Sequence, residues 1–135
     1  MMNLEKFALD CLKAEKFPND RHIFKEYKCE KCGFMPMKLT IEYHTGGTRE
    51  DFKGKILGQC AQCHETTEIL SFTGDHRKKE REEVAICKCG KNLFTAGELE
   101  RFEDDEDMPG GFFDEGVVVG ECAGCGERVD FLYTD

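Results

Sequence analysis

The sequence predicts a small, mainly β protein in which one N-terminal helix precedes two tandem modules, each with a four-cysteine metal site. Three observations support this fold class. The chain has 135 residues and nine cysteines, and eight of these form four closely spaced pairs. Residues 54–73 align without a gap with residues 116–135. In the first module, apolar and polar residues alternate around Leu39, Ile41 and Tyr43, as they do in a half-buried strand.

The first expected element is an amphipathic helix within residues 3–17. Its apolar positions have the spacing of one helix face; they are Leu4, Phe7, Ala8, Cys11 and Leu12. Asn3 is expected to cap the helix and Pro18 to end it. So short a helix is unstable alone, so the apolar face should pack against the rest of the chain. Cys11 has no partner at metal-ligand spacing and is expected to be a small buried core residue.

The aligned segments indicate an internal duplication, and both read as strand, Cys-Ala-x-Cys turn, strand. The identical pairs are Gly54/Gly116, Gly58/Gly120, Cys60/Cys122, Ala61/Ala123, Cys63/Cys125, Glu65/Glu127 and Leu70/Leu132. The predicted divisions are a helix and lead-in at 1–24, modules at 25–73 and 84–135, and a charged linker at 74–83. The linker has no apolar face, so it is expected to be solvated or to form a short exposed helix.

The strands are clearer in the first module. Leu39, Ile41 and Tyr43 alternate with polar residues in one strand, a second begins at Ile56, and residues 67–73 form a third. In the second module, residues 91–103 are ambiguous. Thr95-Ala96-Gly97-Glu98 resembles a helix capping box, whereas alignment with the first module favours a strand.

The paired cysteines predict two metal sites, with ligands grouped within each module. The pairs are Cys29/Cys32, Cys60/Cys63, Cys87/Cys89 and Cys122/Cys125. A Cys-x-x-Cys turn places two thiolates on one side of a knuckle, and two knuckles complete a tetrahedron around Zn²⁺. Gly33, Gly90 and Gly126 follow three of the pairs, where a positive φ can turn an N–H towards a sulfur. A module of about 50 residues buries little core, so two structural zinc ions are expected.

These motifs resemble the zinc-ribbon and rubredoxin-like superfamily. Tyr27 to Phe34 is similar to its first knuckle, and Cys122-Ala123-Gly124-Cys125-Gly126 to its second. The resemblance implies two tandem zinc ribbons over roughly 100 residues, but no particular activity. Rubredoxin-like iron electron transfer is an alternative, although the chain has no Trp and no proline in the second knuckle.

Other chemistry is weakly indicated. Cys60-Ala61-Gln62-Cys63-His64 matches the attachment motif of c-type haem, but its duplicate ends in Gly126. Cys87-x-Cys89 with Cys122-x-x-Cys125 is similar to the zinc switch of redox-regulated chaperones, so a thiol redox switch is a further alternative. No catalytic motif is present, and four thiolates close the zinc shell, so no enzyme is expected and no catalytic residue is assigned. The histidines are expected at the surface; they are His22, His44, His64 and His76.

The charge distribution bears on partners. The net charge is −9, and residues 77–135 carry −8 of it. This acidity argues against nucleic-acid binding. No apolar run could span a membrane, and the N-terminus lacks an apolar signal region, so a cytoplasmic protein with reduced thiols is expected.

An acidic run lies between the last two cysteine pairs and is followed by two aromatic residues. The residues are Glu103, Asp104, Asp105, Glu106, Asp107, Phe112 and Phe113. Five like charges predict a solvated, mobile loop in the second hairpin. As a partner-binding element, the run resembles the acidic hairpin that some zinc ribbons insert into RNA polymerase. The first functional hypothesis is a non-enzymatic zinc protein with a protein partner. The alternatives are a transcription-associated ribbon and a redox or electron-transfer protein.

Overall fold

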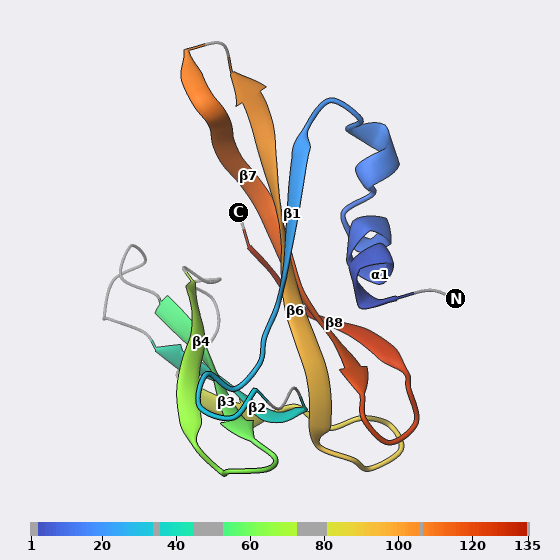
Figure 1. Ribbon diagram of the computed structural model, residues 1–135, viewed down its shortest axis with the longest axis vertical. Helices are drawn as coiled ribbons and strands as arrows, with labels where there is room; N and C mark the ends of the chain where they lie inside the picture. Colours follow the sequence, from blue (N-terminus) through green and yellow to red (C-terminus); the bar gives the residue numbers. More distant parts are fainter. Residues whose placement is uncertain (1–2, 34–35, 45–52, 73–80, 106, 135) are drawn as a thin grey trace. The chain divides into compact units, whose positions relative to one another are not determined.

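The computed structural model describes residues 3–33, 36–44, 53–72, 81–105 and 107–134 (Figure 1). It confirms a small, mainly β protein with one N-terminal α-helix and two four-cysteine clusters. The elements are α1 (Leu4–Cys11), the 3₁₀ turn η1 (Ala14–Lys16), β1 (Arg21–Glu26), β2 (Met37–His44), β3 (Lys53–Cys60), β4 (Thr66–Phe72), β5 (Arg81–Val84), β6 (Leu93–Asp105), β7 (Met108–Cys122) and β8 (Arg128–Thr134).

The chain forms two compact units. Unit 1 comprises residues 1–27, 96–121 and 127–135, and unit 2 comprises residues 28–95 and 122–126. The long strands β6 and β7 therefore contribute residues to both units. The boundaries of these two units differ from those of the two modules that the sequence repeat predicts. The modules at 25–73 and 84–135 therefore stay a prediction from the sequence.

Unit 1 is an antiparallel sheet in the order β1-β6-β7-β8, with α1 packed against it. β1 pairs with β6 from Arg21 opposite Phe102 to Glu26 opposite Gly97. The core joins the helix to the two central strands; it consists of Leu4, Ala8, Leu12, Leu99, Val117 and Val119. Burial of the helix's apolar stripe against the sheet supplies the packing that so short a helix needs.

The helix begins where the sequence predicts but ends earlier. The Asn3 side chain accepts a hydrogen bond from the Lys6 N–H at 2.8 Å, so Asn3 is the N-cap. The helix ends at Cys11 rather than near Pro18, because the apolar stripe stops at Leu12 and Lys13 adopts a left-handed φ of 53°. Cys11 is half-buried beside the core rather than fully buried.

Unit 2 is built on β2. Its buried residues alternate as predicted, with Leu39 and Ile41 inside. β3 and then β4 pair on one side, while β5 and the first residues of β6 also pair with β2. Residues 81–83, expected in a solvated linker or exposed helix, instead belong to β5, with Val84 opposite Thr40. The remaining linker residues, 74–80, lie outside the described residues.

The duplication is structural as well as sequential. Gly54 pairs with Phe72 in the β3–β4 hairpin, and their counterparts Gly116 and Thr134 pair in β7–β8. Both hairpins contain a register shift at the same position, after Ile56 and after Val118. One of the glycines shared by the two copies, Gly58, is explained by steric hindrance. A Cβ at this position would lie 2.5 Å from the Ile69 side chain and 2.6 Å from that of Met37.

Most of the ambiguous segment 91–103 forms a strand, as the alignment with the first module favoured. β6 extends from Leu93 to Asp105, and β7 begins at Met108. The prediction that the acidic run forms a long loop is therefore wrong for residues 103–105, which are strand residues of the β6–β7 hairpin. Glu106 lies outside the described residues. Cross-strand pairing and the nearby cation Arg101 offset the repulsion that suggested a loop.

Candidate metal centres

The first cysteine cluster joins two turns of unit 2. Cys29 and Cys32 follow β1, Cys60 ends β3, and Cys63 lies in the turn before β4. The Sγ atoms of Cys29 and Cys63 are 3.5 Å apart, and those of Cys32 and Cys60 are 3.4 Å apart. All four sulfurs lie within 4.8 Å of one another. Cys29 and Cys60 are buried, whereas Cys32 is exposed.

The second cluster has the same arrangement. Cys87 and Cys89 precede β6, Cys122 ends β7, and Cys125 lies in the turn before β8. The Cys87 and Cys125 sulfurs are 3.5 Å apart, and the Cys89 and Cys122 sulfurs are 3.6 Å apart. These four sulfurs also lie within 4.8 Å of one another. The sulfurs thus group as the duplicated spacing predicts, and all eight cysteines belong to unit 2.

Matching backbone bonds bring the two turns of each cluster together. The Ala61 N–H donates to the Pro36 carbonyl at 3.2 Å, and the Ala123 N–H donates to the Leu93 carbonyl at 2.9 Å. Both alanines belong to the Cys-Ala-x-Cys motif. These bonds hold each second knuckle beside the chain that leads into the neighbouring strand.

Each knuckle closes with a residue of positive φ. Gly33, His64, Gly90 and Gly126 have φ values of 76°, 64°, 91° and 79°. The N–H of each donates to the carbonyl of the first cysteine in its own pair, at 2.8 to 3.0 Å. The left-handed conformation explains the three glycines, and histidine tolerates it better than most residues.

The backbone N–H groups closest to the cysteine sulfurs are not those of Gly33, Gly90 and Gly126, which we expected from the sequence. The Gln62 and Cys63 N–H groups lie 3.4 and 3.5 Å from the Cys60 sulfur, and the Gly124 N–H lies 3.4 Å from the Cys122 sulfur. The Cys63 N–H, followed by that of Gln62, outweighs burial and lowers the pKa of Cys60 to about 6. Equivalent donors lower the pKa of Cys122 to about 6. The pKa of Cys29 is also lowered, foremost by the Cys32 N–H, so two thiols of the first cluster and one of the second are prepared to ionise.

The neighbouring sulfurs limit further ionisation. The Cys89 N–H lowers the pKa of Cys87, but burial and the adjacent thiols, Cys125 foremost, outweigh it and raise the pKa to about 12. Sulfurs this close can all be thiolates when a cation lies between them. A Zn²⁺ with sulfur ligands at about 2.3 Å has sulfur–sulfur edges of about 3.8 Å. Both clusters fit such an ion, and both are able to hold metal ions.

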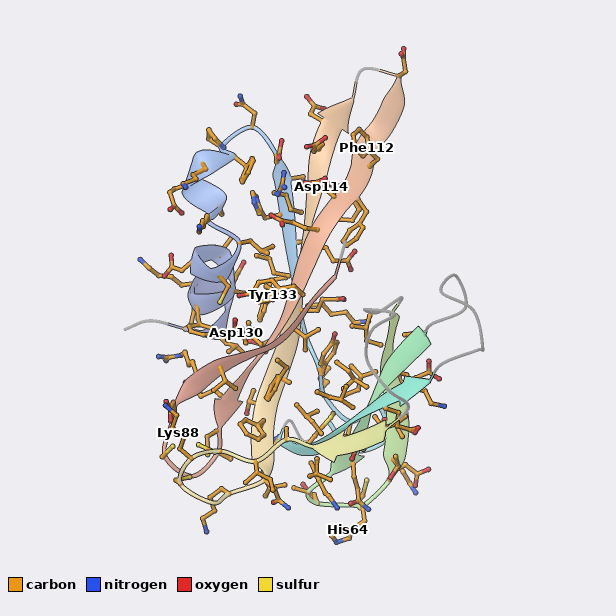
Figure 2. The ribbon with its side chains drawn as sticks, turned by 180° about the vertical axis from the view of Figure 1, so that it is seen from behind. His64, Lys88, Phe112, Asp114, Asp130 and Tyr133 are labelled. Carbon is orange, nitrogen blue, oxygen red and sulfur yellow. The ribbon has the colours of Figure 1, made fainter. Side chains whose placement is uncertain are left out.

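The acidic and aromatic residues singled out from sequence do not join either cluster. Phe112 and Phe113 lie in β7 and are exposed, as is Asp107 before it. Glu103 is half-buried and Asp104 is exposed, both in β6. Figure 2 shows Phe112 on the β6–β7 hairpin and His64 at the surface of unit 2.

The β6–β7 hairpin also contains a buried cation that was not predicted from the sequence. Arg101 is 4% exposed, and its guanidinium lies 2.6 Å from Asp20 and 3.1 Å from Glu115, and also pairs with Asp114. The Phe17 ring stacks on the same group at 3.9 Å. The sequence signal was a lone basic residue between acidic residues, but its partners come from two distant segments, one just before β1 and one in β7.

No protein-family model, curated protein or solved structure matches this chain. In the described residues, no helix has the length and apolar character needed to cross a membrane. The likeness to zinc ribbons therefore rests on the two four-cysteine clusters within a mainly β fold.

Proposed function

We propose that this chain is a non-enzymatic zinc protein in which two structural four-cysteine sites stabilise unit 2 and the acidic β6–β7 hairpin contacts a protein partner. The observation that carries the zinc assignment is the convergence of four sulfurs at each of two duplicated positions. Four thiolates fill the tetrahedral shell of Zn²⁺ and leave no open position for a substrate, which favours a structural role over a catalytic one.

The role of the metal follows from where the ligands lie. Each cluster joins two turns that are separated by about 30 residues of chain. A structural zinc site contributes its binding free energy to folding, so it compensates for the small core of these hairpins. The zinc ions also neutralise part of the thiolate charge and leave each site with a formal charge of −2.

The experiment is elemental analysis of protein purified without added metal. We expect two zinc ions per chain and no visible colour, and we expect Cys60→Ser to retain one zinc. Cobalt reconstitution should give the absorption of a tetrahedral thiolate site. One metal or none would refute the two-site proposal, and a red ferric site would replace it with electron transfer.

A further inference from the structure

In the part of the chain that the structure describes, the β6–β7 hairpin has an unpaired strand edge in unit 1. β8 pairs with β7 only from Gly116 to Glu121, and β1 pairs with β6 only as far as Phe102. Within the described ranges, β7 before Gly116 pairs with β6 alone, and Figure 1 shows the hairpin continuing past these pairs. We call residues 111–115 of this strand the β7 edge. An open edge presents backbone N–H and C=O groups to any added strand.

The β7 edge contains two exposed aromatic side chains. Phe112 is 39% exposed and Phe113 is 38% exposed. The Phe113 ring contacts Phe102 edge-to-face at 5.9 Å, and the Arg21 guanidinium lies 5.0 Å from the Phe102 ring. Successive strand residues point to opposite sides, so a ring is available on each face beside the edge.

The charge around the β7 edge is strongly negative. Unit 1 contains 7 Lys and Arg against 18 Asp and Glu, a net charge of −11, whereas unit 2 contains 12 against 10, a net charge of +2. Arg101 is the one basic residue of the β6–β7 hairpin within unit 1. It offsets a single charge, so the hairpin has carboxylates in excess. A second copy of this acidic edge would be repelled, whereas a basic segment would be attracted.

The hairpin is also held in place before any partner arrives. Arg101 connects Asp114 and Glu115 of the β7 edge to Asp20, which precedes β1. Gly111 has a φ of 76°, and a Cβ at this position would lie 2.1 Å from the Glu103 carbonyl oxygen, so the backbone of β7 lies close to that of β6 here. A preorganised edge loses less conformational entropy on binding.

We propose that the β7 edge binds an extended basic segment of a partner protein by strand addition. Backbone hydrogen bonds would give affinity, Phe112 and Phe113 would contact apolar side chains, and the carboxylates would select Lys and Arg. This inference rests on the proposed function as a protein-interaction protein and names the chemistry of its partner.

The test uses the zinc-loaded full chain and the peptide Lys-Val-Lys-Val-Lys-Val-Lys, followed by amide hydrogen exchange and NMR titration. We expect slower exchange at alternate amides of the β7 edge. The same peptide with proline in place of its central valine should give no such slowing, because proline removes a donor and disfavours the strand. The Glu-for-Lys peptide should not bind.

Two sets of variants locate the contacts. Asp104→Asn/Asp107→Asn should weaken binding roughly tenfold at low salt, and Phe112→Ser/Phe113→Ser should weaken it by a similar factor. Glu26→Gln/Glu127→Gln is the matched control, since it removes two charges of unit 1 outside the hairpin and should change binding by less than about twofold.

Equal binding of the proline peptide, without exchange protection, would overturn strand addition while leaving an electrostatic protein-interaction role. Absence of binding by the basic peptide, or protection at a different strand, would overturn the assignment of this edge. Zinc analysis of the same samples separates both outcomes from failure of the zinc proposal.

Discussion

Replacing Arg101 tests how the acidic hairpin is stabilised. The guanidinium is 4% exposed and contacts Asp20, Asp114 and Glu115, with Phe17 stacked on it. Arg101→Met keeps an aliphatic side chain but leaves these carboxylates close together without a cation. Removing one partner of a buried ion pair costs about 3–5 kcal/mol. The three carboxylates are partly exposed and can regain some water, so we expect a loss of about 3 kcal/mol.

The assay is urea unfolding of the zinc-saturated protein, followed by circular dichroism and by exchange of β1 and β6 amides. Arg101→Lys should recover less than half of the loss, because one ammonium group cannot reproduce three separate guanidinium contacts. Arg128→Met is the control, since Arg128 pairs with the partly exposed Glu121 at 3.0 Å and should cost less than about 1 kcal/mol. A loss below about 1 kcal/mol for Arg101→Met would refute the reasoning.

Three further predictions follow from the site geometry. Cys122→Ser should lower the zinc content by one ion and shift amide resonances along β6 and β7, whereas Cys60→Ser should confine its shifts to residues 28–72. Burial, then the charge of Glu100, raises the pKa of Glu98 to about 7. Protonation of Glu98 therefore stabilises the folded state, and this stabilisation is complete below the ordinary pKa of 4.5. It amounts to up to about 3 kcal/mol and is lost as the pH rises towards 7. Glu98→Gln should therefore make the free energy of unfolding less dependent on pH over this range. Gly111→Ala should destabilise the hairpin by about 2 kcal/mol or more in thermal unfolding, because its Cβ would lie 2.1 Å from the Glu103 carbonyl oxygen, while Gly33→Ala, with open space around it, should cost about 1 kcal/mol.

Local and repeated features were predictable from the sequence. The alternation around Leu39 and Ile41 predicted β2, and the spacing of the cysteine pairs predicted how the sulfurs group. The repeat also predicted equivalent hairpins, and the structure adds a matching register shift after Ile56 and Val118 that was not predicted. These features depend on periods and spacings within short stretches of chain, which a single sequence displays directly.

Features that depend on distant partners were not predictable. The charges of residues 103–107 suggested a loop. That prediction failed because the sequence alone does not show that β6 pairs with β1 and β7, or that Arg101 contacts Asp20. Residues 81–83 looked like a solvated linker, yet they pair with β2 across about 40 residues of chain. Tertiary pairing overrides local charge and propensity in both segments.

The second cysteine cluster and the β7 edge involve the same two strands, so a zinc ion bound at this cluster would have a role beyond local folding. Cys89 lies shortly before β6, and Cys122 is the last residue of β7. A metal ion bound to both would fix the register in which these strands pair, and a one-residue slip would exchange the two faces of the hairpin. Such a slip would separate Arg101 from Asp114 and Glu115 and would reverse the positions of Phe112 and Phe113. The first site lacks this connection, because Cys60 and Cys63 belong to β3 and its turn. Loss of the second zinc should therefore weaken binding at the β7 edge more than loss of the first.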